Sequence, residues 1–222
     1  MVKKNEIYHL HIAKTGGHWV REEIVNALRG HVKIYEETFH HGWTPVKPTS
    51  YVISSWREPA KRTVSHYAYL IKIGRIPVEK LTANDFFAWV KKNKSYLKNY
   101  QAKNILYSGS NKYMFETNYE FFENKNVNED LTIERIKSFE FFIRDTQMIA
   151  SNVNKIVSKM YKYFEMPQHS IVPGSDELRN KNSMSLELYN YLTSFEIEEL
   201  QELNNLDCRI YNDLSLFWNG GE

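Results

Sequence analysis

The sequence contains one cysteine, Cys208, and no long hydrophobic run. A single cysteine excludes an internal disulfide framework and a zinc site built from several cysteines. No apolar run approaches the ~20 residues that a transmembrane helix needs. Residues 1–6 lead directly into strand-like sequence without an apolar leader. We therefore expect no secretory signal, no membrane partner and a cytoplasmic location, and we predict no metal ligand set.

Net charge is also low, at +2, but its distribution along the chain is uneven. Residues 1–115 carry a net charge of +11, whereas residues 116–222 carry −9. A basic half favours an anionic ligand. The alternative is that lysines such as Lys91 and Lys92 only solvate a helix face. A composition of 42% hydrophobic and 25% charged residues is typical of a globular chain, so residues 1–222 are predicted to form one domain.

Short runs of β-forming residues alternate with helical patterns through the first third of the chain. This alternation is typical of the α/β class, with a P-loop-like open parallel sheet flanked by helices. Apolar alternation predicts the strands and a spacing of three to four predicts the helices. We expect strands at 6–12, 32–35 and 51–56, and helices at 18–29 and 59–73.

The pattern is less regular beyond residue 73. A polar loop is expected at 116–130 and another long loop at 167–183, where loop length itself suggests function. The C-terminal part is predicted to be helical from residue 185. The remaining expected elements are a helix at 84–92 capped by Asn84, a helix at 95–106, a strand at 139–144 and a helix at 146–164.

The first strand leads into the turn Lys14-Thr15-Gly16-Gly17, which has the features of an anion site. Glycines let the backbone approach a ligand closely, and the amides at a helix N-terminus point toward negative charge. Lys14 adds a full positive charge. Because the lysine precedes the glycines, this is not the Gly-x-x-x-x-Gly-Lys-Ser/Thr loop. The alternative is a plain glycine turn with a surface lysine.

A second candidate site follows the third strand, at Trp56-Arg57-Glu58-Pro59. Ligands of open α/β sheets bind beyond the carboxyl ends of the strands, where Arg57 can hold a phosphate with two parallel hydrogen bonds. Ser65, about two helical turns further on, could present its hydroxyl to the same anion. The alternatives are an ion pair of Arg57 with Glu58 and a packing role for Ser65. Arg62 is expected to brace the loop.

These two stretches resemble motifs of a known family. His11-Ile12-Ala13-Lys14-Thr15-Gly16-Gly17 resembles the 5′-phosphosulfate loop of sulfotransferases that use 3′-phosphoadenosine 5′-phosphosulfate (PAPS). The stretch from Arg57 to Tyr67 resembles their 3′-phosphate motif, with the same order and Arg-to-Ser spacing. The likeness is greatest to the carbohydrate (heparan-type) branch. It implies transfer of a sulfuryl group from PAPS to an acceptor hydroxyl, with a saccharide as the favoured acceptor.

The resemblance implies a role for each matching residue. Lys14 would contact the bridging oxygen and the sulfuryl group, while Arg57 and Ser65 would bind the 3′-phosphate. Trp19 would stack on adenine. The backbone amides of the loop would bind the 5′-phosphate, and a late loop would contact the nucleotide. The loop residues are Thr15, Gly16, Gly17 and His18, and the late-loop residues are Arg179 and Lys181.

The chain departs from the family pattern at three places. Ala13 stands where the branch has proline, His18 where it has a threonine or serine, and Ile143-Arg144 where it usually has a glycine. The first two departures fall within the cofactor loop itself. The third weakens the late alignment only.

The chemistry that the resemblance implies also needs a base. Sulfuryl transfer resembles phosphoryl transfer, in which positioning and charge stabilisation dominate and Lys14 would neutralise the leaving phosphate. The acceptor hydroxyl needs a base as it attacks, and histidine is suited to neutral pH. His41, in the loop after the second strand, is favoured and His40 is next. The alternative for each of the two residues is an exposed loop histidine with no catalytic role.

Residues 74–135 are a candidate insertion on the acceptor side, with tyrosines interleaved among lysines. Such a face could stack sugar rings and hold acidic groups, or bind single-stranded nucleic acid, which the resemblance does not lead us to expect. An amphipathic helix with half-buried tyrosines is the third interpretation. Two other functions stay open: a small-molecule kinase, and a non-catalytic nucleotide- or polyanion-binding module. The tyrosines and lysines of the candidate acceptor face are Tyr96, Tyr100, Tyr107, Tyr113, Lys94, Lys98, Lys103 and Lys112.

Overall fold

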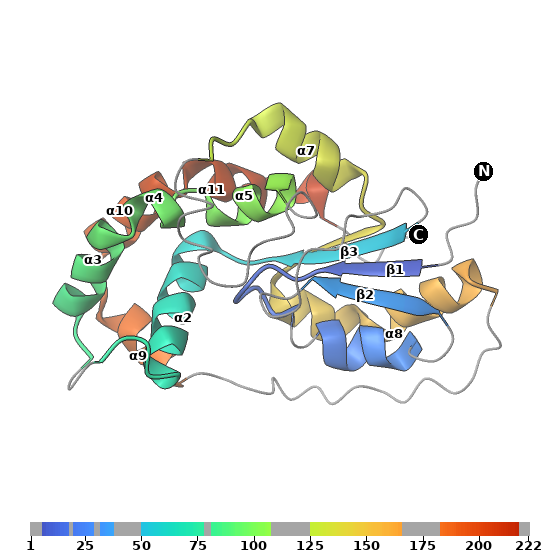
Figure 1. Ribbon diagram of the computed structural model, residues 1–222, viewed down its shortest axis with the longest axis horizontal. Helices are drawn as coiled ribbons and strands as arrows, with labels where there is room; N and C mark the ends of the chain where they lie inside the picture. The colour runs from blue at the N-terminus through green and yellow to red at the C-terminus, as the bar shows by residue number, and fades with distance from the viewer. Residues whose placement is uncertain are drawn as a thin grey trace.

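A four-stranded parallel sheet forms the centre of the computed structural model (Figure 1). The structure describes residues 6–17, 20–28, 32–37, 50–77, 81–107, 125–165 and 183–217. The strands are β1 (Glu6–Leu10), β2 (Lys33–Glu37), β3 (Ser50–Trp56) and β4 (Phe141–Arg144), in the order β2-β1-β3-β4. Each neighbouring pair is parallel. The prediction of an α/β fold with a parallel sheet is confirmed.

Both faces of the sheet are apolar because successive side chains along a strand point to opposite sides. One face carries Tyr8, Leu10, Val52, Trp56 and Phe142 into the larger of two hydrophobic cores. The other face carries Ile7, Tyr51, Ile53, Phe141 and Ile143 into the smaller core. Strands with two buried faces are expected in parallel sheets covered by helices on both sides.

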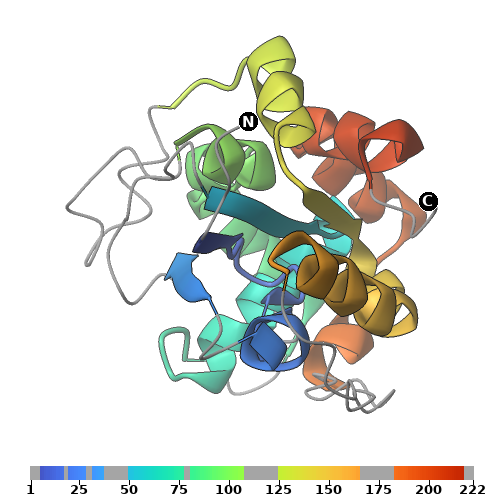
Figure 2. The ribbon, with the colours of Figure 1, turned by 90° about the vertical axis from the view of Figure 1, so that its right-hand side faces the viewer.

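The two faces are covered by different parts of the chain (Figure 2). On the side of the smaller core lie α8 (Asp145–Tyr163) and the helical segment of residues 20–28. On the side of the larger core lie α5 (Tyr100–Tyr107), α7 (Glu129–Lys137) and α11 (Asn205–Asn212). The fold therefore has three layers, with the sheet in the middle.

The segment after β1 is helical, as expected, but it is not an α-helix. Residues Val20–Val25 form a π-helix, and Asn26–Leu28 form a 3-10 turn. The prediction rested on the apolar positions Val20, Ile24, Val25 and Leu28, and of these Val20, Ile24 and Leu28 are buried in the smaller core. The wider π winding is rare in proteins and occurs frequently at functional sites.

Helix α2 (Pro59–Lys72) begins directly after β3 and carries both Arg62 and Ser65. Pro59 occupies its first turn, where the missing proline amide leaves no unpaired donor. The Glu58 carboxylate caps the helix by accepting the amides of Ala60 (3.1 Å) and Lys61 (2.7 Å). Glu58 therefore acts as a helix cap and forms no ion pair with Arg57.

The remaining helices pack around α2 and the larger core. They differ from the sequence-based expectation in three ways. Thr82, not Asn84, caps the helix at 83–92, because the Thr82 hydroxyl accepts the Asp85 amide. The expected helix at 95–106 is broken at Asn99, which has φ +47°. Helix α7 begins inside the expected loop of 116–130, of which residues 116–124 lie outside the described part. The helices are α3 (Ala83–Lys92), α4 (Lys94–Leu97), α9 (Ser183–Tyr191) and α10 (Ser194–Leu203), with a 3-10 turn at Leu214–Leu216.

The N-termini of α5 and α11 cap each other across more than 100 residues of sequence. The Asp207 carboxylate on α11 accepts the amides of Gln101 (3.0 Å) and Ala102 (2.9 Å) in the first turn of α5. In return, the Asn99 side-chain oxygen accepts the amide of Leu206 at 3.1 Å. Each helix thereby satisfies donors that its own first turn leaves unpaired. We refer to this arrangement as the α5–α11 clamp.

Replacement of Asn99 tests the clamp. Asn99→Ala removes the acceptor for the α11 amides and places alanine in the left-handed region, which asparagine tolerates better. We expect the free energy of unfolding to fall by about 2–3 kcal/mol, from the lost cap and the backbone strain together. Urea denaturation measures the change. Asn212→Ala, at an exposed position of α11, is the matched control, and an equal loss in both variants would contradict the clamp.

Candidate functional site

The turn after β1 is anchored by a buried threonine. The Thr15 hydroxyl donates to the Ile12 carbonyl at 2.8 Å and lies 3.0 Å from the Ser55 hydroxyl on β3. The Thr15 amide makes a longer bond of 3.4 Å to the same carbonyl. Because Ser55 is two residues before Arg57, the Thr15–Ser55 contact ties the lysine turn to the strand that carries the arginine.

The backbone of the turn is held in conformations that suit glycine. Gly16 has φ +90° and Lys14 has φ +68°, and for a residue with a Cβ this region costs about 1–2 kcal/mol. At Gly17 a Cβ would lie 1.9 Å from Cδ2 of the His11 ring, so only glycine fits there. His11 in turn stacks on His9, with ring centroids 5.4 Å apart. His9 is buried in β1 and His11 is half-buried just after it, so both rings pack against the turn.

Arg57 meets the lysine turn in space. Its Nη1 donates to the Lys14 carbonyl at 3.3 Å, although the two residues are 43 positions apart. Its own main chain is held by Gln101 of α5, whose Oε1 accepts the Arg57 amide (3.0 Å) and whose Nε2 donates to the Arg57 carbonyl (2.9 Å). The structure therefore brings together the two stretches that the sequence singled out.

A third cation, Arg62, lies behind the turn and is buried, with 1% of its surface exposed. Its Nε donates to the Ala13 carbonyl at 3.2 Å, and its guanidinium lies 3.5 Å from the centre of the Tyr100 ring. The expectation that Arg62 braces the loop agrees with this contact. Its Nη1 and Nη2 are buried and have no hydrogen-bond acceptor among the described residues. A buried guanidinium with two unpaired nitrogens favours a nearby anion.

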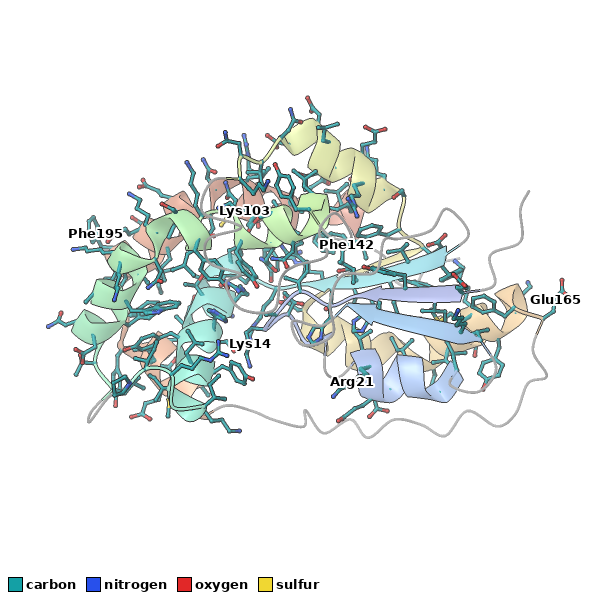
Figure 3. All side chains as sticks on the ribbon, viewed as in Figure 1. Lys14, Arg21, Lys103, Phe142, Glu165 and Phe195 are labelled. Carbon is teal, nitrogen blue, oxygen red and sulfur yellow. The ribbon has the colours of Figure 1, made fainter. Side chains whose placement is uncertain are left out.

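Lys14 extends toward α2, beyond the carboxyl ends of the strands (Figure 3), and its Nζ lies 4.6 Å from the centre of the Tyr69 ring. Burial lowers the pKa of Lys14 to about 8, and repulsion by Arg57, Arg62 and Lys72 adds to the shift. Burial also lowers the pKa of Arg57. We call Lys14, Arg57 and Arg62 the cation cluster.

No carboxylate among the described residues lies within ion-pair distance of the cation cluster. Asp145, at the start of α8, and Glu58 are the acidic groups whose fields reach Arg57 and oppose the lowering of its pKa. Positive charge that is buried without a paired carboxylate is unfavourable unless an anion compensates it. The arrangement can therefore bind an anion at the carboxyl ends of β1 and β3.

Ser65 lies on the buried side of α2, two helical turns from Arg57, with 3% of its surface exposed. Its neighbour His66 is also buried. His66 Nε2 lies 3.4 Å from the Tyr96 hydroxyl. Burial lowers the pKa of His66 well below its usual value, and Arg62 and Lys14 add to the effect. His66 is therefore neutral and forms part of the wall behind the cation cluster.

Sequence reasoning missed two residues near the cluster, Gln101 and Asp145. Gln101 carries no charge and lies in a helix, so no local pattern marks it. Asp145 accepts a hydrogen bond from the Tyr211 hydroxyl at 2.5 Å, and this bond, after burial, helps to raise the pKa of Tyr211 to about 12. The place of Asp145 directly after β4 could have drawn attention to it, because the carboxyl ends of parallel strands share one edge.

Several predicted site residues lie outside the described part of the chain. They are His18, Trp19, His40, His41, Arg179 and Lys181. Within the described part, no group of three or more histidine, cysteine, aspartate and glutamate side chains could hold a metal ion. The helices described are each too short or too polar to cross a membrane.

The interpretation of residues 94–113 as an exposed lysine–tyrosine face does not fit the described residues. Tyr96 and Tyr100 are buried in the larger core. Lys103 is also buried, and its Nζ donates to the Ser95 carbonyl at 2.6 Å. Lys94 and Lys98 are exposed, whereas Lys112 and Tyr113 lie outside the described part. For these helices the amphipathic interpretation is the one that the burial supports.

Comparison of the chain with protein-family models, with curated proteins and with solved structures returns no match.

Replacing Lys14 by methionine tests whether the positive charge of this lysine lowers the free energy of unfolding. Because the pKa of Lys14 is lowered in the folded state, its charge destabilises the fold below about pH 8, and this penalty fades as pH rises from about 8 toward 10.5. We expect Lys14→Met to be at least as stable as the parent at neutral pH and to lose relative stability as pH rises through this range. Urea denaturation at several pH values measures the difference.

Lys91→Met, on the exposed face of α3, is the matched control and should leave the pH dependence unchanged. A Lys14→Met variant that is clearly less stable than the parent at neutral pH would show that the lysine is an ordinary stabilising surface residue.

Proposed function

We propose that the protein is a sulfotransferase that moves a sulfuryl group from PAPS to an acceptor hydroxyl and releases adenosine 3′,5′-bisphosphate (PAP). The observation that carries the proposal is the cation cluster, in which Arg62 is buried and no carboxylate among the described residues lies at ion-pair distance. A cofactor with phosphate groups at two ends supplies the missing negative charge. The motif resemblance supplies the identity of that cofactor.

The geometry supports a division of roles within the cluster. Lys14 and the amides of the glycine turn serve the 5′-phosphosulfate, because the turn ends at a helix N-terminus. Arg57 serves the 3′-phosphate together with Ser65. The Lys14 carbonyl accepts from one of the five N–H groups of the Arg57 guanidinium. The other nitrogens of that guanidinium are available for a phosphate.

The chemistry follows from charge stabilisation. As the bond between sulfur and the bridging oxygen breaks, negative charge builds on the leaving phosphate, and Lys14 stabilises it. The charged form of Lys14 does this work, and a bound anion raises the pKa of the lysine from about 8 and so keeps it protonated. His41, or His40 in its place, is proposed to accept the proton of the attacking hydroxyl. A saccharide acceptor and a cytoplasmic location remain part of the proposal.

A thermal-shift titration tests the cofactor. At about 100 times its dissociation constant, a ligand that binds only the folded state adds ~2.7 kcal/mol, which raises the melting temperature of a chain of this size by roughly 5–10 °C. We expect this shift with PAP and a much smaller one with AMP or ATP. A shift with ATP and Mg²⁺ alone would select a small-molecule kinase. Equal shifts with heparin and PAP and no turnover of labelled PAPS would select a polyanion-binding module.

The proposed base is tested separately from the cofactor. His41→Ala is expected to keep the PAP-induced thermal shift and to lose turnover of labelled PAPS by about 100-fold or more, because a positioned base contributes ~10²- to 10⁴-fold. His40→Ala is the neighbouring control. Unchanged turnover in His41→Ala with a loss in His40→Ala would move the role to His40, and unchanged turnover in both would remove this loop from the mechanism.

A further inference from the structure

We infer that Gln101 is a positioning residue that fixes the Arg57 guanidinium for recognition of the 3′-phosphate, and that the α5–α11 clamp holds Gln101 in place. The inference rests on the proposed function and deepens it. It assigns the discrimination between nucleotides with and without a 3′-phosphate to α5, a helix that lies outside both cofactor motifs.

Within the described part of the chain, the Gln101 side chain forms hydrogen bonds with Arg57 alone. Its two polar atoms bond to the amide and the carbonyl of Arg57, at 3.0 and 2.9 Å, so both hydrogen-bonding groups of the Arg57 main chain are occupied. Gln101 is fully buried. Because donor and acceptor are both used, the orientation of the side-chain amide is determined and a carboxylate of the same shape cannot replace it.

This pairing matters because, among the residues that the structure describes, only Gln101 forms hydrogen bonds with the Arg57 main chain. Arg57 directly follows the last residue of β3, and α2 begins two residues later. At this position the chain leaves the sheet ladder, so a small rotation of the backbone would displace the guanidinium by several ångströms at the end of its long side chain. Gln101 replaces the missing ladder partner and sets the direction in which the side chain leaves the backbone.

The first turn of α5 also contacts a second cation of the cluster, Arg62. Tyr100, next to Gln101, places its ring 3.5 Å from the guanidinium carbon of Arg62. The backbone amide of Gln101 is itself held by the Asp207 carboxylate at 3.0 Å. One helical turn therefore holds the main chain of Arg57 and the side chain of Arg62, and α11 holds that turn. The relative position of the two guanidinium groups is set by this helix.

The test compares two nucleotides that differ only in the 3′-phosphate. Gln101→Ala is expected to weaken PAP binding by about tenfold or more, the loss that corresponds to one misplaced charge-assisted contact. Binding of AMP should stay within about twofold. Gln101→Glu, which keeps the shape and one acceptor, should also lose affinity for PAP. Gln201→Ala, at an exposed glutamine of α10, is the matched control and should bind PAP as the parent does.

A double-mutant cycle separates positioning from general damage to the fold. In the Arg57→Ala background, Gln101→Ala should have no further effect on PAP affinity, because its influence passes through Arg57. A loss that simply adds in the double variant, or an equal loss for AMP, would overturn the inference.

Two further measurements keep the inference distinct from the proposed function. Amide hydrogen exchange of the ligand-free protein should accelerate at Arg57 in Gln101→Ala and remain slow in the centre of α2. Unchanged exchange at Arg57 would refute the role of Gln101 in holding the Arg57 main chain. If the parent protein binds no PAP, the proposed function fails, and the same cycle is then run with inorganic sulfate. In that case, equal sulfate affinity for the parent and Gln101→Ala would overturn the positioning role.

Discussion

The gathering of three positive charges at one edge of the sheet, Arg62 buried and Lys14 and Arg57 half-buried, is the constraint around which the rest of this structure is organised. Lys14, Arg57 and Arg62 lie beyond the carboxyl ends of β1 and β3, and none has a carboxylate partner at ion-pair distance among the described residues. They are held by neutral groups: the carbonyls of Ala13 and Lys14 accept from the two arginines, and aromatic rings lie beside Arg62 and Lys14. These contacts fix the positions of the charges without neutralising them.

The parts of this arrangement that are local in sequence could be predicted from it. Runs of β-forming residues predicted all four strands of the sheet, and the carboxyl-edge rule for parallel sheets placed Arg57 at the edge where ligands bind. Pro59 correctly marked the start of α2. For the strands and for the start of α2, the residues that give the signal are the residues that form the element, so the signal is local.

Features that depend on distant residues could not be predicted in this way. Asn99 and Asp207 lie 108 residues apart, and a sequence pattern does not show that each caps the helix of the other. The same holds for Gln101, which looks like an ordinary helical residue until β3 is placed beside it. Tyrosines that suggested an exposed face proved to be core residues, because spacing reveals a periodicity but not which side of the helix the sheet will cover.

Holding cations with neutral partners has a consequence for binding. A guanidinium in an ion pair must give up its carboxylate before it can bind a phosphate, and the separated carboxylate then repels the ligand. Arg57 and Arg62 are held by carbonyl oxygens and a ring, which an incoming anion does not have to displace. Folding therefore brings the positive charges together at the expense of the free energy of unfolding. Binding of an anion removes the repulsion between them. Such a site favours ligands that carry more negative charge, and this is the property that a nucleotide with phosphates at two positions would exploit.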